Sequence, residues 1–257
     1  MSRRHLTFTC EGSSLASTLD EGELSTGLLL VSGGNEIRSG AWNGQAQFAA
    51  AVAGKGFPVF RFDRRGVGDS EGTNGEFLAS GADIAAARDA FRAEAPHLER
   101  IVGFGNSDAA SALMLNEGCG LDALVLFNPW TFESADTPPP PDAVRAHYRQ
   151  RLGDKAAIKR LLTGQVSLAK LFASLMSSLR PAPPPSTLAE NMATGIAGFE
   201  GQVSILIADR DRTGQAFVSS WRKDDPRLRT CEGATHSYVE ASGRDWLAER
   251  VLEVLRG

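Results

Sequence analysis

A serine, an aspartate and a histidine that could together carry out nucleophilic catalysis lie far apart in the sequence, and the serine has the most specific surroundings. Ser107 stands in the string Gly105-Asn-Ser-Asp-Ala109, between an apolar run at 101–104 and a helix-like segment. Strand, sharp turn and helix with a serine at the turn is the layout of a nucleophile elbow. Such a turn needs small residues two positions before and after the serine, as Gly105 and Ala109 are. The alternative is that Ser107 only caps the following helix.

The acid and the base are predicted from the strands that precede them. Asp211 follows the apolar run 203–207 at small-x-x-Asp spacing, and Asp209 is the alternative acid. His236 follows the expected last strand in a loop that contains glycine; the other histidines, in less suitable positions, are His5, His97 and His147. The order serine, aspartate, histidine is that of α/β-hydrolases.

The chemistry of such a triad is acyl transfer through a covalent intermediate. We expect His236 to take the Ser107 proton as the hydroxyl attacks a carbonyl carbon. Asp211 would fix the imidazole tautomer and stabilise the imidazolium. Water would then release the acyl group.

An oxyanion site is predicted at the string Ser32-Gly-Gly-Asn35, directly after the apolar run 27–31. We assign the two donors to the backbone N–H groups of Gly34 and Asp108, with Asn35 as the near alternative; each donor contributes about 3 kcal/mol in well-studied enzymes. An ordinary strand-to-helix turn is the competing interpretation. Two roles are open for the Asp108 carboxylate: it disfavours anionic substrates, or it anchors the elbow.

The elements that must position these residues form an α/β pattern. A hairpin over 5–20 precedes strands and helices that alternate from 27 to 130, with helices expected at 42–54 and 83–95. Strands at 203–207 and 228–232 and a helix at 243–255 complete the series. The pattern predicts an α/β-hydrolase fold, a mostly parallel sheet with helices on both faces, built from residues 1–130 and 201–257.

The string Asp63-Arg-Arg-Gly-Val-Gly-Asp-Ser70 is the most specific in the chain. We expect a glycine-rich loop beside the carboxyl edge of the sheet, braced by Asp63 and Arg65 rather than catalytic. Asp69 and Ser70 are predicted to cap the helix that follows.

Residues 131–200 are predicted to form a helical lid insert. Two proline runs, at 137–142 and 181–186, bracket helices expected at 144–152, 156–162 and 168–179. The last has an apolar stripe at helical spacing. We expect the stripe to cover the mouth of the site and, with Trp130, to line an acyl pocket through Leu171 and Leu175; simple packing onto the core is the alternative.

Bulk properties narrow the class of protein. The chain has 257 residues, 42% of them hydrophobic, and a net charge of −4, so it lacks the basic excess of a nucleic-acid-binding protein. Cysteines at 10, 119 and 231 suggest neither a disulfide framework nor a zinc site. No signal core, membrane-spanning run, phosphate loop or dinucleotide fingerprint is present. We expect a cytoplasmic protein without a cofactor or stable membrane insertion; its oligomeric state is open.

Four strings resemble the exosortase A system-associated hydrolases of type 1: Ser32-Gly-Gly-Asn35, Arg61-Phe-Asp-x-Arg-Gly-x-Gly-Asp-Ser-Glu-Gly72, Gly105-x-Ser-Asp-Ala-Ala-Ser111 and Asn128-Pro-Trp130. The resemblance runs over nearly the whole chain and implies a bacterial α/β-hydrolase associated with exopolysaccharide and exosortase machinery. Two departures stand out. That family often has Gly-Gly-Pro-Gln in the first loop, and often Cys where Ser107 stands, so whether Ser107 is the natural nucleophile is open.

The leading hypothesis is a serine hydrolase that cleaves a small-molecule carboxylic ester through an acyl-enzyme. An acyltransferase or thioesterase with the same triad is the alternative, because it differs only in the acceptor or leaving group. A non-catalytic binding protein on a hydrolase scaffold is the alternative of another class.

Overall fold

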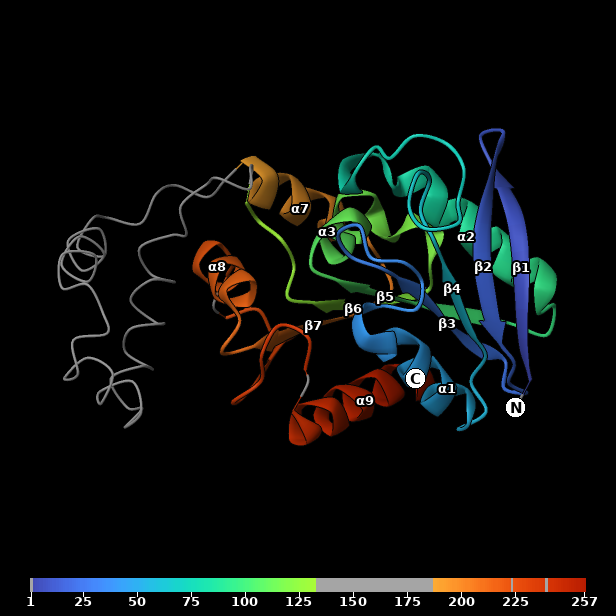
Figure 1. The fold of residues 1–257 in the computed structure, drawn as a ribbon. Helices are drawn as coiled ribbons and strands as arrows, with labels where there is room; N and C mark the ends of the chain where they lie inside the picture. The colour runs from blue at the N-terminus through green and yellow to red at the C-terminus, as the bar shows by residue number, and fades with distance from the viewer. Residues whose placement is uncertain (1, 133–186, 223, 239) are drawn as a thin grey trace, which may run out of the picture.

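An eight-stranded sheet organises the molecule (Figure 1). The computed structural model describes residues 2–132, 187–222, 224–238 and 240–257. The strand order across the sheet is β1-β2-β4-β3-β5-β6-β7-β8. The strands are β1 (Arg3–Cys10), β2 (Ser13–Asp20), β3 (Thr26–Val31), β4 (Val59–Phe62), β5 (Arg100–Asn106), β6 (Ala123–Phe127), β7 (Gln202–Ala208) and β8 (Leu228–Cys231).

The six strands from β3 to β8 run parallel, and the hairpin at one edge is antiparallel. β2 pairs antiparallel with both β1 and β4. Because the carboxyl ends of the parallel strands share one edge, the loops that follow them meet there. That edge receives every residue predicted to act in catalysis.

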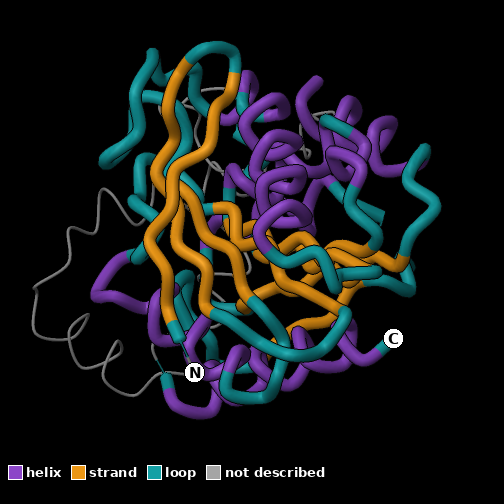
Figure 2. Tube along the Cα trace, turned by 90° about the vertical axis from the view of Figure 1, so that its right-hand side faces the viewer, coloured by secondary structure: helices purple, strands orange, loops and turns teal. Residues whose placement is uncertain are grey.

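Helices cover both faces of the sheet (Figures 1 and 2). One face carries α1 (Gly44–Ala53) and α9 (Ala241–Arg256), and the other carries α2 (Gly81–Glu94), α3 (Asp108–Leu115) and α7 (Thr187–Ala197). α8 (Arg212–Ser220) follows β7, and short 3₁₀ turns are η1 (Ala41–Asn43), η2 (Phe77–Ala79) and η3 (Glu117–Gly120).

Alternation along each strand produces two hydrophobic layers. In β3, Leu28 and Leu30 join the layer under α1 and α9, whereas Leu29 and Val31 join the layer under α2 and α3. Successive side chains of a strand point to opposite faces, and both faces of a parallel sheet are buried. The continuous apolar run at 27–31 follows from this, and the predicted fold class is confirmed.

Two local predictions were wrong. The helix expected from residue 42 begins at Gly44, because Trp42 and Asn43 have left-handed φ angles of 55° and 60° and the Trp42 side chain is 93% exposed. Asp69 and Ser70 do not cap a helix: Ser70 Oγ donates to the Asp63 carbonyl at 2.7 Å, and α2 starts only at Gly81. The glycine-rich loop is longer than the pattern indicated, and Ser70 bonds to Ala16 of β2 and to Asp63 instead of capping a helix.

The expected lid lies mostly outside the described residues, and so do Leu171 and Leu175. The last part of the insert is α7, which packs against α3. A Cβ atom added at Gly195 would lie 2.2 Å from the Met114 carbonyl oxygen, so the two helices approach closely there. Within the described ranges, every helix is too short or too polar to cross a bilayer.

Candidate active site

Ser107 occupies a strained turn between β5 and α3. Its backbone angles, φ 56° and ψ −121°, lie where a residue with a side chain is rarely found. Such a conformation costs about 1–3 kcal/mol and persists only where the surroundings enforce it. A Cβ atom at Gly105 would lie 2.8 Å from the Ala109 carbonyl carbon and the Ala110 nitrogen. Glycine is therefore needed sterically at position 105 of the elbow.

Backbone contacts from the end of β6 enforce that turn. The Ser107 N–H donates to the Phe127 carbonyl at 2.9 Å, and the Ser107 carbonyl accepts from the Trp130 N–H at 3.2 Å. The Ser111 hydroxyl lies one helical turn later and donates to the Trp130 carbonyl at 2.7 Å. Asn128 accepts the Ala208 N–H at 2.8 Å, which ties β7 to the same place. The Asn-Pro-Trp string thus supports the elbow.

His236 and Asp211 meet after β8 and β7. The His236 Nδ1 and Asp211 Oδ2 atoms are 3.0 Å apart. Asp211 is also the N-cap of α8, because its Oδ2 accepts the Gly214 N–H at 2.9 Å. The carboxylate is therefore held by the helix that it caps, and it in turn orients the imidazole.

Asp209, the alternative acid, has a different partner. Its Oδ1 accepts the N–H of Gly233 at 2.8 Å, in the turn that leads to His236. The Thr235 hydroxyl donates to Glu240, at the N-cap of α9, at 3.0 Å. These contacts support the histidine loop from both sides, whereas the imidazole itself pairs with Asp211.

The surroundings of His236 favour its protonated form. The hydrogen bond to Asp211 raises the pKa of His236, partial burial opposes the rise, and the negative charges of Asp211, Glu36 and Asp108 add to it. The net pKa lies above the ordinary histidine value. Glu36 lies in the loop after β3 and Asp108 directly follows Ser107, so the charges of both loops act on the imidazole.

The predicted oxyanion donors are only partly free. The Gly34 N–H donates to the Asp108 Oδ1 atom at 2.5 Å. Neither the Asp108 N–H nor the Asn35 N–H has a hydrogen-bond acceptor among the described residues, and Asp108 is the first residue of α3. The first amides of a helix have no intrahelical acceptor and carry positive partial charge. The Asp108 amide is thus suited to receive an oxyanion.

Arg64 is the residue that sequence reasoning missed. Its side chain is only 4% exposed, lies 3.6 Å from the Asp108 carboxylate, and donates to the Gly34 carbonyl and to Ser80 Oγ. Two arginines follow Asp63 in the sequence, and this doubled arginine is the signal that could have indicated Arg64. Of these two arginines, the pattern predicts a bracing role for Arg65 alone. Arg65 instead pairs with Asp83 of α2 at 2.5 Å and with Glu11 in the turn between β1 and β2.

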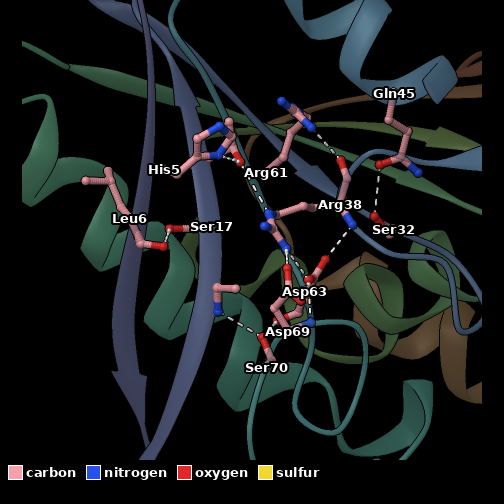
Figure 3. Close-up of polar contacts among 12 residues, drawn as sticks. His5, Leu6, Ser17, Ser32, Arg38, Gln45, Arg61, Asp63, Asp69 and Ser70 are labelled. Atoms are coloured by element: carbon pink, nitrogen blue, oxygen red, sulfur yellow. Dashed lines mark hydrogen bonds and ion pairs between the residues drawn. The ribbon is translucent and has the colours of Figure 1, made fainter.

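Asp63 braces the glycine-rich loop, as predicted, and also contacts the loop after β3, which was not predicted (Figure 3). Its buried carboxylate accepts the Arg38 N–H at 2.5 Å and pairs with the Arg38 guanidinium, and it also accepts the Asp69 N–H at 3.1 Å. Arg61 donates to the Arg38 carbonyl at 2.7 Å and pairs with Asp20. Asp63 and Arg64 therefore both hold the loop after β3, whereas Arg65 contacts α2 and the turn between β1 and β2.

The cysteines, the possible metal ligands and Trp130 are the remaining residues that the sequence analysis considered. Each of the three cysteines, all in the described part, is a free thiol. Burial raises the pKa of Cys10 and of Cys119 to about 11, which keeps both thiols protonated near neutral pH. No group of three histidine, cysteine or acidic residues suited to a metal ion occurs among the described residues. Trp130, the described member of the predicted pocket, is half-buried and donates to the Phe132 carbonyl at 2.8 Å.

Comparison with known families agrees with this architecture. The Alpha/beta hydrolase family pattern matches residues 28–250, most of the chain. The chain belongs to the α/β-hydrolase family. None of the curated proteins matches it in sequence.

Several solved protein structures share this fold at low sequence identity. An esterase of Pyrococcus furiosus has a TM-score of 0.62 and 17% identity, over 99% of this chain and 91% of that one. The α/β hydrolase GrgF of Penicillium sp. sh18 has a TM-score of 0.63 and 14% identity, over 100% and 98%. An α/β serine hydrolase without a lid from Xanthomonas campestris has a TM-score of 0.59 and 15% identity, over 100% of this chain and 94% of that one. At these identities the likeness concerns the fold.

Proposed function

We propose that this α/β-hydrolase cleaves carboxylic esters of small molecules through a triad of Ser107, His236 and Asp211. The observation that carries the proposal is the 3.0 Å contact between His236 Nδ1 and Asp211 Oδ2, at the same sheet edge as the strained Ser107 turn. An imidazole whose Nδ1 donates to a carboxylate presents Nε2 as a base. The esterases with this fold support the choice of substrate class.

The reaction follows from these roles. His236 accepts the Ser107 hydroxyl proton as Oγ attacks the ester carbonyl carbon, and the C–O bond to the leaving alcohol breaks as His236 returns the proton. Water then attacks the acyl-enzyme with His236 again as base. Asp211 stabilises the imidazolium in both halves. The Asp108 amide is one oxyanion donor, and the Asn35 N–H, the alternative to Gly34 in the loop after β3, is the candidate for the second.

The insert at 131–200 belongs to this proposal as a lid. It would cover the site and, with Trp130, form the acyl pocket. The core would then consist of residues 1–130 and 201–257.

The experiment compares hydrolysis of p-nitrophenyl esters, from acetate to a long acyl chain, by the wild-type protein and by Ser107→Ala. We expect turnover with an optimum chain length in the wild type and a loss of about 10⁴-fold or more in the variant. Ser219→Ala is the matched control, because Ser219 is a half-buried serine of α8 whose hydroxyl donates to the Ala216 carbonyl within its own helix.

Mass spectrometry of the same samples separates the alternatives. A stable acyl adduct on Ser107 without turnover would indicate an acyltransferase that awaits its acceptor, and turnover of acyl thioesters in preference to esters would indicate a thioesterase. Neither turnover nor adduct would contradict catalysis by Ser107 and favour a binding protein; Ser107→Cys then tests whether the site needs a thiol.

A further inference from the structure

The carboxylate next to the nucleophile is held from two sides. Asp108 Oδ1 accepts the Gly34 N–H at 2.5 Å, and Asp108 Oδ2 lies 3.6 Å from the Arg64 guanidinium. The Asp108 side chain is 15% exposed and that of Arg64 only 4%. This pair connects the first residue of α3 with the loops after β3 and β4.

The pair bonds to both peptide groups that flank the Gly34 Cα atom. Asp108 accepts the Gly34 N–H, while Arg64 donates to the Gly34 carbonyl. Arg64 is itself positioned by Ser80 Oγ at 2.9 Å, just before α2. Both polar groups of Gly34 are therefore used, and each is bonded to a charged side chain.

Steric contact reinforces this link. A Cβ atom added at Gly33 would lie 2.5 Å from the Asn106 carbonyl oxygen and 3.0 Å from Asp108 Oδ1. The loop after β3 thus packs directly on the end of β5, one residue before Ser107. At Gly34, by contrast, an added Cβ atom would meet no atom within 4 Å.

Two roles are possible for a carboxylate in this place. It could be a plug that a substrate carbonyl displaces from the Gly34 amide, or a permanent support. Hydrogen bonds to an ionised group are roughly twice as strong as neutral ones, so a neutral carbonyl competes poorly. Displacement would also leave the buried Arg64 cation without its carboxylate partner, which is strongly unfavourable. Both arguments favour the support.

We propose that Asp108 and Arg64 are positioning residues that hold the Gly34 peptide against the elbow, so that the Gly34 N–H anchors the loop and does not bind the oxyanion. The pair thereby fixes the Asp108 amide, the oxyanion donor, beside Ser107. The catalytic part of this inference rests on the proposed esterase function. It corrects the sequence-based assignment of Gly34 as a donor and selects anchoring of the elbow as the role of the Asp108 carboxylate.

The kinetic test uses Asp108→Asn, which keeps an acceptor oxygen but removes the charge, and Arg64→Gln. With p-nitrophenyl acetate we expect kcat to fall by about tenfold to a hundredfold in each variant while KM changes by less than about threefold, because misplaced catalytic groups affect the transition state most. Each rate is measured on the alkaline plateau of its own pH profile, since Asp108 also raises the pKa of His236.

A second readout does not depend on catalysis. Hydrogen exchange of the Gly34 amide, followed by NMR on ¹⁵N-labelled protein, should accelerate by about tenfold or more in Asp108→Asn. The matched control is Asp83→Asn, which removes the charge of a carboxylate that is only 5% exposed and lies 2.5 Å from its arginine partner, Arg65. That control is expected to leave both kcat and Gly34 exchange unchanged.

The outcomes are distinct. Higher kcat in Asp108→Asn would mean that the carboxylate is a plug and would overturn the proposal, and so would a fall in kcat without faster Gly34 exchange. Unchanged kcat would equally overturn it. If the wild-type protein neither hydrolyses esters nor reacts at Ser107 with a fluorophosphonate, the proposed function fails, and the catalytic part of the inference fails with it. Hydrogen exchange of the Gly34 amide then still decides whether Asp108 and Arg64 hold the loop.

Discussion

Two charged pairs lie at the carboxyl edge of the sheet, and they are built in opposite ways. Arg64 and Asp108 join the loop after β4 to the start of α3, with side chains 4% and 15% exposed. His236 and Asp211 join two loops of the second half, with side chains 41% and 8% exposed. In the first pair the cation is the more deeply buried member, and in the second pair the carboxylate is.

The difference suits different tasks. A guanidinium stays charged at any physiological pH, so the buried Arg64 keeps its bonds to several acceptors over that whole range. An imidazole titrates near neutral pH, and partial exposure lets it exchange protons with substrate and water. We infer that the first pair maintains the geometry of the site and that the second performs the chemistry.

The largest effect should come from His236→Gln. We expect kcat/KM for p-nitrophenyl acetate to fall about 10⁴-fold, because glutamine cannot act as a base, while the free energy of unfolding changes by less than about 1 kcal/mol. The control is His97→Gln, because His97 is an exposed histidine at the opposite edge of the sheet. We expect its activity to be unchanged. A loss below tenfold would contradict the distinction between the two pairs.

Arg64→Met should act chiefly on stability. We expect urea denaturation to give a free energy of unfolding lower by about 3–5 kcal/mol, because the Asp108 carboxylate would keep a mostly buried charge without its cation. Arg92→Met is the control: its pair with Asp122 is exposed, so the expected change is below about 1 kcal/mol. Equal, small changes in both variants would show that Arg64 is not a structural joint.

Gly105→Ala should strain the elbow itself. The added methyl group would lie 2.8 Å from α3 backbone atoms, and overpacking of this kind costs about 1–3 kcal/mol. Gly44→Ala is the contrasting variant, since the new Cβ atom meets nothing within 4 Å and the φ of −59° is helical. That change should stabilise by up to about 1 kcal/mol in thermal unfolding. Similar results for both would contradict the steric account of the elbow.

The smallest effect concerns pH. Since the proposed base is neutral His236, kcat/KM should rise with pH through its raised pKa, with the midpoint of the acidic limb above about 6.5. Glu36→Gln removes one of the negative charges that raise this pKa, so the limb should move to lower pH by a fraction of a unit. Glu99→Gln, beyond the amino end of β5, should not move it. A shift to higher pH in Glu36→Gln would refute the electrostatic assignment.

Local patterns predicted most of the scaffold. Continuous apolar runs gave the central strands, and the small residues around Ser107 gave the elbow, because burial on both faces and steric crowding act on residues adjacent in sequence. The cap at Asp69 and Ser70 failed because Ser70 bonds to Ala16 of β2 and to Asp63, and local spacing does not encode a partner as distant as Ala16. The helix start at 42 failed because the backbone is left-handed at Trp42 and Asn43.

The sequence by itself therefore determined the α/β class, the position of the turn at Ser107 and the order in which the three candidate catalytic residues occur. Tertiary structure decided which aspartate contacts His236, that Asp108 bonds Gly34, and that Arg64 rather than Arg65 reaches the site. Elements follow from short-range propensity and periodicity. A side chain's partner depends on distances of a few ångströms between loops that only the folded parallel sheet brings to one edge.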